Sequence, residues 1–157
     1  LRPDPGTYAL LLRAERPQSI AVGALGPLRL TPGLYVYVGS ALGPGGVRAR
    51  VARHARAAST RHWHVDYVRA AARLDGVCFA YHPDRLECAW AQALRQHPEA
   101  SVPMDGFGAS DCRCTAHLLR FGATADAAPI CRSLRRVTPS STTVHTADGA
   151  ALRANEA

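Results

Sequence analysis

Hydrophobic residues in the first quarter of the chain follow the pattern of β-strands. Residues 6–12 form an almost continuous apolar run that is entered from a Pro-rich turn, which is typical of a buried strand. Two shorter runs, residues 19–22 and 28–30, are separated by glycine and proline and predict further strands. In residues 34–39 aliphatic residues alternate with tyrosines, so this strand presents an aliphatic face and an aromatic face.

The pattern changes to a helical period after a Gly-Pro-Gly-Gly break at residues 43–46. Apolar residues recur at helical spacing in residues 47–58, 62–74 and 84–96, and each of these ranges predicts a helix. Short apolar runs that are rich in β-formers predict further strands over residues 77–81 and 117–121.

The order of these elements predicts one domain of the α+β class, with a small, mostly antiparallel central sheet flanked by helices. Residues 98–111 are rich in glycine and predict a loop. We expect the domain to span residues 1–138, and residues 139–157 to form a polar C-terminal tail. A chain of 157 residues suits one core of ordinary size.

Charge and hydropathy narrow the classes of function. The formal net charge is +7, and all 19 basic residues are arginine, which favours a polyanionic partner although a codon bias toward arginine would produce the same composition. No apolar run approaches the roughly 18 residues that a membrane-spanning helix requires. The first residues lack the pattern of a secretory signal, so we expect a cytoplasmic protein that binds no membrane.

The basic residues are concentrated in the first two predicted helices. Residues 47–64 contain five arginines and three histidines and no acidic residue, so this stretch attracts anions. Arg50 and His54 lie four positions apart and therefore share one helix face. A solvated basic helix face with a packed imidazole is the alternative interpretation.

Two tyrosine triplets carry a family resemblance. Gly6-Thr7-Tyr8 opens the first strand, and Tyr37-Val38-Gly39 closes the strand before the basic helix. These triplets resemble those that define the GIY-YIG nuclease superfamily. A longer pattern is similar to a prokaryotic branch that in some archaea is fused to endonuclease III, and it comprises Gly33 to Gly43, Arg50 to His54, His62 to Tyr67, Gly106 to Cys114 and His117 to Leu119.

The resemblance implies a divalent-metal-dependent endonuclease that hydrolyses phosphodiester bonds, with DNA as the expected substrate. In this assignment Tyr8 or Tyr37 acts as the base or orients the attacking water, Arg50 neutralises the phosphate and His54 assists proton transfer. Glu87 holds Mg²⁺ or Mn²⁺. Because an ordinary tyrosine pKa leaves only about one part in a thousand ionised at pH 7, we expect Arg50 or the metal to lower that pKa and the rate to rise with pH.

The chain also departs from the family pattern. The two triplet tyrosines are separated by 28 residues, which is longer than a short hairpin. Ser40 stands where some members carry lysine, and it joins three arginines of the basic helix as the candidate contacts to nucleic acid: Arg48, Arg53 and Arg56. Asp84 and Glu87 have the spacing of a capping box, so closing a helix terminus is the alternative role for Glu87.

The five cysteines form a second constellation. Their number is odd and their spacing irregular, which favours free thiols or a metal over a disulfide framework. Cys112, Cys114 and His117 lie close together along the chain, and Cys88 or one of His62 and His64 would complete a tetrahedral zinc site. The spacing is uncommon for zinc, and cysteines are frequently buried, so unliganded buried thiols are the favoured interpretation and structural zinc is the alternative.

Two other classes of function compete with the nuclease. In one, the protein is a non-catalytic module that grips phosphates with its arginine helix and stacks bases on its tyrosines. In the other, it is a zinc-stabilised Cys/His domain.

Overall fold

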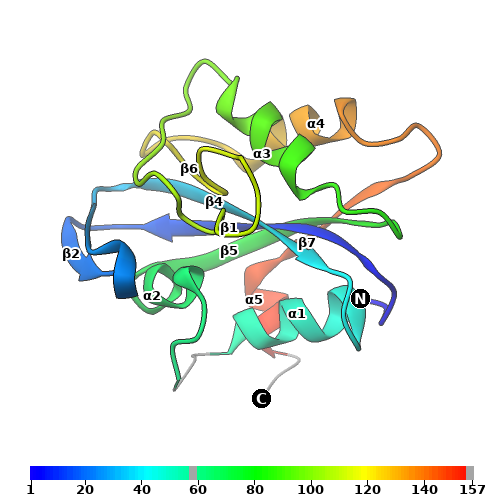
Figure 1. Ribbon diagram of the computed structural model, residues 1–157, viewed down its shortest axis with the longest axis horizontal. Helices are drawn as coiled ribbons and strands as arrows, with labels where there is room; N and C mark the ends of the chain where they lie inside the picture. Colours follow the sequence, from blue (N-terminus) through cyan, green and yellow to red (C-terminus); the bar gives the residue numbers. More distant parts are fainter. Residues whose placement is uncertain (57–59, 155–157) are drawn as a thin grey trace.

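The chain folds around one antiparallel sheet. The structure, a computed structural model, describes residues 1–56 and 60–154. Within these residues the sheet has five strands in the order β6-β4-β1-β5-β7, with every neighbouring pair antiparallel (Figure 1). Their bounds are β1 (Gly6–Ala14), β4 (Gly33–Ala41), β5 (Arg73–Tyr81), β6 (Leu118–Phe121) and β7 (Val144–Asp148).

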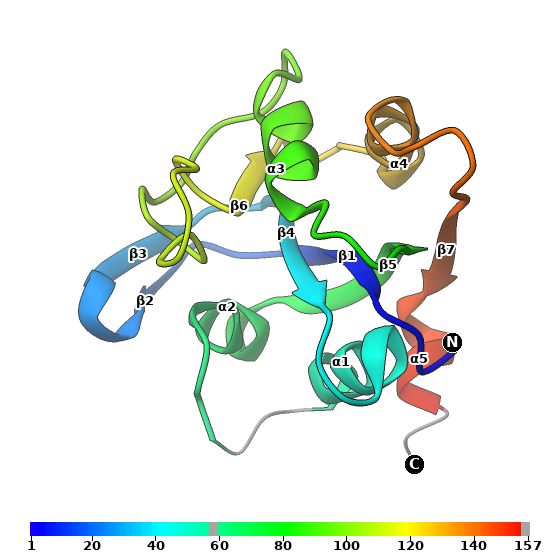
Figure 2. The ribbon, with the colours of Figure 1, turned by 45° about the vertical axis from the view of Figure 1, so that its right-hand side comes forward.

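Helices cover both faces of this sheet. One face packs against α1 (Gly46–Ala55), α2 (His64–Ala71) and the short C-terminal α5 (Gly149–Ala154), and the other packs against α3 (Glu87–Arg95) and α4 (Ala127–Arg136). Figures 1 and 2 show the two layers on opposite sides of the strands. The predicted α+β class, with a small antiparallel sheet flanked by helices, is confirmed.

The alternation along β4 sorts its side chains between the two cores. Leu34, Val36 and Val38 pack in the cluster that α3 and α4 cover. Tyr35 and Tyr37 lie on the opposite face, in the cluster covered by α1 and α2. The predicted aliphatic and aromatic faces of this strand are confirmed, because successive side chains of a strand point to opposite sides.

A second hairpin fills the long link between the triplets. The strands β2 (Gln18–Ala21) and β3 (Pro27–Leu30) pair with each other around a 3₁₀ turn at Gly23–Leu25. This two-stranded sheet lies beyond the ends of β1 and β4, which still pair directly along their full length. The extra residues therefore leave the relation between the two triplet strands unchanged.

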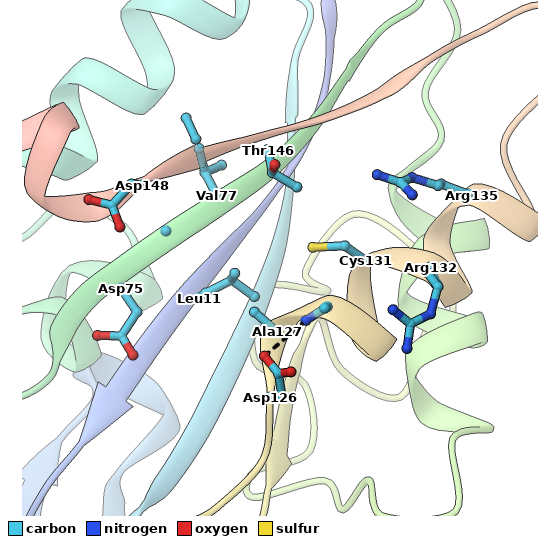
Figure 3. A pocket seen from close by; sticks show the side chains of 13 residues that line it. Leu11, Asp75, Val77, Asp126, Ala127, Cys131, Arg132, Arg135, Thr146 and Asp148 are labelled. Carbon is cyan, nitrogen blue, oxygen red and sulfur yellow. Dashed lines mark hydrogen bonds between the residues drawn. The ribbon is translucent and has the colours of Figure 1, made fainter.

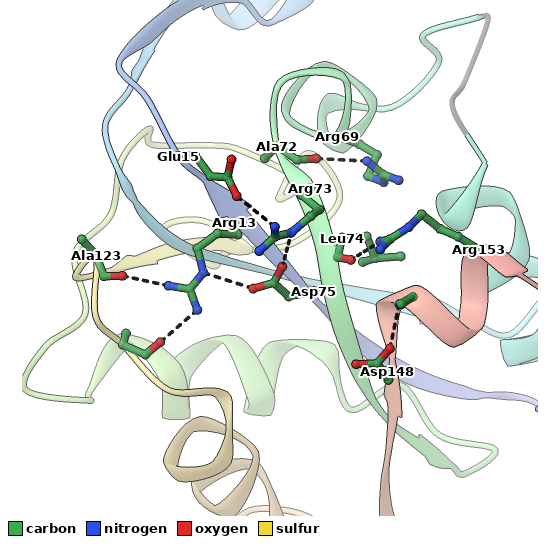
Figure 4. Close-up of polar contacts among 12 residues, drawn as sticks. Arg13, Glu15, Arg69, Ala72, Arg73, Leu74, Asp75, Ala123, Asp148 and Arg153 are labelled. Carbon is green, nitrogen blue, oxygen red and sulfur yellow. Dashed lines mark hydrogen bonds and ion pairs between the residues drawn. The ribbon is translucent and has the colours of Figure 1, made fainter.

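Helix boundaries differ from those that the sequence pattern predicts. The first helix was expected over residues 47–58, of which residues 57 and 58 lie outside the described residues, and α1 ends at Ala55. The second helix ends at Ala71, and β5 begins already at Arg73 because these residues continue the pairing with β1. The Arg13 guanidinium reinforces this end of the sheet by binding Asp75 and the carbonyl oxygen of Ala123 (Figure 4).

The polar C-terminal residues belong to the sheet, so the predicted tail is wrong for residues 144–154. Val144–Asp148 forms the edge strand β7, which pairs with β5, and α5 follows directly. Only Val144 of this strand is buried, which explains why its hydrophobic pattern is weak. The helix α4, which the sequence pattern did not predict, precedes it and buries Ile130, Cys131 and Leu134.

Two of the five cysteines form a disulfide. Cys78 on β5 is bonded to Cys131 on α4, 53 residues further along the chain. The expectation that the cysteines are thiols or metal ligands is therefore wrong for this pair. The two residues were not recognisable as partners because only the packing of α4 on the sheet brings them together.

No helix in the described ranges is long and apolar enough to cross a membrane, as the sequence predicted.

Candidate functional site

The two triplets lie side by side because β1 and β4 pair in register. Tyr8 is opposite Gly39, and its ring crosses this glycine. A Cβ atom at Gly39 would lie 2.5 Å from the Tyr8 hydroxyl oxygen and 2.6 Å from Cζ, so any other residue would displace the ring. The Tyr37 ring lies on the same face, with its centroid 6.5 Å from that of Tyr8. The glycine of the second triplet thus makes room for the tyrosine of the first.

A polar cleft of about 190 Å³ opens beside these tyrosines. Its walls come from β1, β4, α1, the start of α2, the start of α3 and the loop before β6. The cleft brings together four of the five predicted catalytic side chains, with His54 directly behind Tyr8. The lining residues are Tyr8, Tyr37, Gly39, Ser40, Arg50, Trp63, Arg85, Glu87 and Asp111.

His54 is the residue that supports Tyr8 from behind. It is 1% exposed, and its Nε2 lies 3.0 Å from the Tyr8 hydroxyl oxygen. Burial, together with the nearby Arg53 charge, lowers the pKa of His54 to about 3, so the imidazole is neutral at physiological pH. Arg69 fixes the end of α1 by donating to the carbonyl oxygens of His54 and Ala55, which would otherwise lack helical partners.

Burial also determines the direction in which the pKa values of the two tyrosines are shifted. It raises the pKa of Tyr8 well above its usual value and outweighs the opposing effect of the Arg50 charge. The pKa of Tyr37 is likewise raised by burial and by the Glu87 carboxylate. The expectation that Arg50 lowers the tyrosine pKa on balance is therefore wrong for the protein alone, and it no longer supports a rate that rises with pH through phenol ionisation.

Arg50 is positioned for an external anion. Its guanidinium lies over the Trp63 ring, 4.6 Å from the centroid, and it lines the cleft next to the tyrosines. Among the described residues no carboxylate pairs with it. Trp63 was not predicted to belong to the site, although its place between two basic helices was a usable signal.

Arg53 is paired with a carboxylate of the neighbouring helix. It forms two hydrogen bonds with Asp66, of 2.9 and 2.8 Å, and stacks on Trp63 at 3.8 Å. Burial alone would raise the pKa of Asp66, but the Arg53 hydrogen bonds and the amides of Trp63 and His62 lower it to about 2. Arg53 therefore holds α1 against α2 and does not line the cleft, and its role as a phosphate contact stays a prediction.

Of the remaining predicted nucleic-acid contacts, one lines the cleft and two do not. Ser40 lines the cleft, and its buried hydroxyl has no hydrogen-bond partner among the described residues. Arg48 and Arg56 are exposed on and just after α1 but do not line the cleft. Arg48 lies instead beside a separate hollow, next to Leu1 and Leu152.

Glu87 is the first residue of α3, so the capping box predicted for it does not form. The N-cap position is Leu86, which makes no side-chain cap, and its amide donates to the Thr7 hydroxyl at 3.2 Å. The helix starts three residues later than the sequence pattern predicts because this contact with β1 replaces the local cap. Glu87 is 6% exposed and lines the cleft. Thr7, the middle residue of the first triplet, therefore positions the helix start that carries Glu87.

Arg85 joins two carboxylates at the edge of the cleft. Its Nη1 lies 3.3 Å from the Glu87 carboxylate and 2.9 Å from that of Asp111, on the loop before β6. This arrangement shows that the two carboxylates can share one cation. The sequence analysis did not single out Asp111, because only the folded loop brings its carboxylate to Arg85.

The three remaining cysteines converge with His117. The ligand atoms of Cys88, Cys112, Cys114 and His117 all lie within 4.8 Å of one another and could hold a metal ion. Three thiols and an imidazole suit zinc better than Mg²⁺ or Mn²⁺. The predicted grouping is therefore present in space, with Cys88 contributed by α3 and the other three residues by the loop before β6.

A larger hollow of about 430 Å³ lies on the α4 side of the sheet. Figure 3 shows Arg132 and Arg135 facing it from α4, and Asp75 and Asp148 facing it from the strands. None of the predicted catalytic residues lines it.

The chain belongs to the family described as "Domain of unknown function DUF123", which it matches over residues 7–138. The match begins within the first triplet and includes the cleft, α3 and the cysteine loop. No curated protein and no solved structure matches the chain.

Proposed function

Because this chain belongs to the DUF123 family, its activity has to be inferred from its cleft, and we propose that it is a divalent-metal-dependent endonuclease of the GIY-YIG type that acts on DNA. The observation that carries the proposal is the meeting of Tyr8, Tyr37, Arg50 and Glu87 in one polar cleft. These residues come from four separate elements, and their order along the chain is the one that the resemblance implies.

Arg50 binds the scissile phosphate. Its planar guanidinium is held over Trp63 and remains available for two parallel hydrogen bonds to phosphate oxygens. Negative charge builds on these oxygens as the phosphodiester is attacked, so a fixed cation stabilises the transition state more than the ground state. Ser40 also lines the cleft.

Tyr8 and His54 orient the attacking water. With its proton on Nδ1, neutral His54 accepts a hydrogen bond from the Tyr8 hydroxyl at Nε2, over 3.0 Å, which leaves a lone pair of the Tyr8 oxygen to accept a hydrogen bond from the water. The water oxygen bonds to phosphorus as the bond from phosphorus to the leaving oxygen breaks, and the proton that the water loses ends on the leaving oxygen. The low pKa of His54 keeps the imidazole neutral, so that it acts as a hydrogen-bond acceptor for Tyr8. Tyr37 orients the water from the other strand.

Glu87 and Asp111 are the residues that would hold Mg²⁺ or Mn²⁺. Both carboxylates lie within salt-bridge distance of the same Arg85 nitrogen, which supports the proposal that they are close enough to bind one ion. Mg²⁺ is commonly bound by one or two carboxylates together with substrate phosphate. When bound there, the ion would neutralise charge on the phosphate and on the leaving oxygen.

The test is cleavage of fluorescently labelled single-stranded and duplex DNA, with Mn²⁺ or Mg²⁺ and with EDTA as the metal-free control. Glu87→Gln should lower kcat/KM by about 100-fold or more, which corresponds to about 3 kcal/mol of transition-state stabilisation. Arg50→Lys should be nearly as damaging, because an ammonium cannot reproduce the guanidinium fork. Glu99→Gln, at an exposed position after α3, removes the same charge and should leave the rate unchanged.

Full metal-dependent cleavage by Glu87→Gln would contradict the assignment of the metal site. Tight binding of DNA with no cleavage under any metal condition would instead support the non-catalytic nucleic-acid module.

A further inference from the structure

We propose that Cys88, Cys112, Cys114 and His117 bind one structural zinc ion that fastens residues 106–117 to the start of α3. The four side chains come from two places, the second position of α3 and the loop that leads into β6. The site is separate from the divalent-cation site at Glu87, and it does not depend on nuclease activity.

The distances agree with a tetrahedral site. Zn–S bonds of about 2.3 Å and Zn–N bonds of about 2.0 Å place neighbouring ligand atoms about 3.5–3.8 Å apart. The His117 Nε2 atom lies 3.4 Å from the sulfur of Cys112 and 4.0 Å from that of Cys88. All four ligand atoms lie within 4.8 Å of one another, so small side-chain rotations suffice to bring them to one ion.

The donor set points to zinc with a structural role. Three thiolates and one imidazole form a closed, soft set that leaves no position for water, as in structural rather than catalytic zinc sites. The three cysteines are each partly exposed, whereas inert free cysteines are usually buried. Three partly exposed thiols gathered around one histidine nitrogen are better explained as ligands than as packing residues.

The backbone already holds the histidine in place. The His117 amide donates to the Phe107 carbonyl oxygen at 2.7 Å, and the His117 carbonyl accepts from the Val38 amide at 2.9 Å. The Gly106 amide closes the base of the loop by donating to Thr115 at 2.7 Å. This frame fixes His117 beside β4, so a metal bound to it would pull the cysteines toward the sheet.

The position of the site links it to the cleft. Cys88 follows Glu87 directly, and Cys112 follows Asp111, so the ion would fasten together the two segments that carry the cleft carboxylates. This consequence rests on the proposed function. Zinc would act on catalysis only through position, by keeping Glu87 and Asp111 at a constant separation.

Metal content tests the proposal directly. The full chain is expressed in zinc-supplemented medium without a histidine tag, and it is purified under reducing conditions without chelators. Elemental mass spectrometry should find about one zinc per chain. Cobalt(II) exchanged into the site should give the intense visible absorption of a tetrahedral thiolate complex. Removal of zinc by a strong chelator should lower Tm, and added zinc should restore it.

Variants identify the ligands. His117→Cys keeps four ligands, so it should retain zinc and an unchanged Tm. His117→Ala and the double variant Cys112→Ser with Cys114→Ser should lose zinc and have a lower Tm. His145→Ala, at an exposed position on β7, is the matched control and should retain its zinc. Glu87→Gln should keep its zinc while losing cleavage, because it alters a different site.

Two results would overturn the proposal. One is a native chain that holds only traces of zinc after supplementation. The other is a disulfide in the freshly purified protein among Cys88, Cys112 and Cys114. Full zinc retention by the double cysteine variant would also overturn it. Stoichiometric zinc in a protein that does not cleave DNA would uphold the zinc site and contradict the proposed nuclease, so the two failures are distinguishable.

Discussion

Burial decides the protonation of the residues that meet behind the cleft. Tyr8 and His54 share a hydrogen bond in an environment that disfavours charge on either ring, so the pKa of Tyr8 rises and that of His54 falls. The pair is therefore neutral at physiological pH.

The low pKa of His54 makes the stability of the protein depend on pH. The folded state keeps His54 neutral down to about pH 3, whereas the unfolded chain binds a proton below about pH 6.5. Stability from this group is thus present above pH 6.5 and is lost as the pH falls toward 3. Between pH 7.5 and 5 the loss should be about 2 kcal/mol, measured by urea unfolding.

His54→Gln should remove this part of the pH dependence. Burial lowers the pKa of His117 as well, but the native protein and the variant both contain His117. The difference between their curves of unfolding free energy against pH therefore isolates the contribution of His54. Parallel curves over this pH range would show that His54 titrates normally in the folded state.

At the scale of elements, the start of α3 is set by a contact with the sheet rather than by its own sequence. The Thr7 hydroxyl accepts from the Leu86 amide, and the next residue is Glu87. The strand β1, which carries the first triplet, therefore sets the position at which the Glu87 carboxylate lines the cleft. The helix has no local cap that could take over this task.

Thr7→Val tests this link, because valine has the shape of threonine without the hydroxyl. The partly buried Leu86 amide would lose its acceptor, and the free energy of unfolding should fall by about 1 kcal/mol. The cleavage rate should fall further than the folded fraction does, and the Mn²⁺ concentration needed for half-maximal rate should rise. Thr146→Val, at an exposed position on β7, is the control. An unchanged metal requirement in Thr7→Val would show that Glu87 is positioned independently of this bond.

At the scale of the whole molecule, the arginines have two roles: some stabilise the fold through internal contacts, and others place positive charge on the surface. Arg13, Arg69 and Arg153 all donate to backbone carbonyl oxygens (Figure 4). Arg53 is paired with Asp66. Net charge therefore overstates the surface that is available to nucleic acid. The exposed arginines of α1 remain the candidate surface around the cleft.

Salt dependence measures how many arginines contact phosphate. Binding to duplex DNA, followed by fluorescence anisotropy in EDTA to prevent cleavage, should weaken steeply with salt, with a log–log slope of about −0.9 per phosphate contact. Arg48→Gln with Arg56→Gln should make the slope shallower by up to about 2. Arg135→Gln with Arg136→Gln removes the same charge from α4, on the other face of the sheet, and should leave the slope unchanged. Equal slopes for the two double variants would exclude α1 from the binding surface.

The sequence by itself determined the features that depend on local regularity. Alternation defined the faces of β4, the triplets marked where two strands carry tyrosines, and a spacing of four placed Arg50 and His54 on one face of α1. These inferences succeeded because strand and helix periods act over a few residues. The same reasoning missed β7, since an edge strand with one buried residue has little pattern to detect.

Only the tertiary structure decided which of these residues act together. It separated Arg50, which faces the cleft, from Arg53, which is neutralised by Asp66, although both lie on the same helix. It also excluded the capping box as the alternative role of Glu87, which lines the cleft, and it brought Cys88 to the loop at residues 112–117. Pairing, burial and pKa depend on neighbours that are distant along the chain, and no local period records those neighbours.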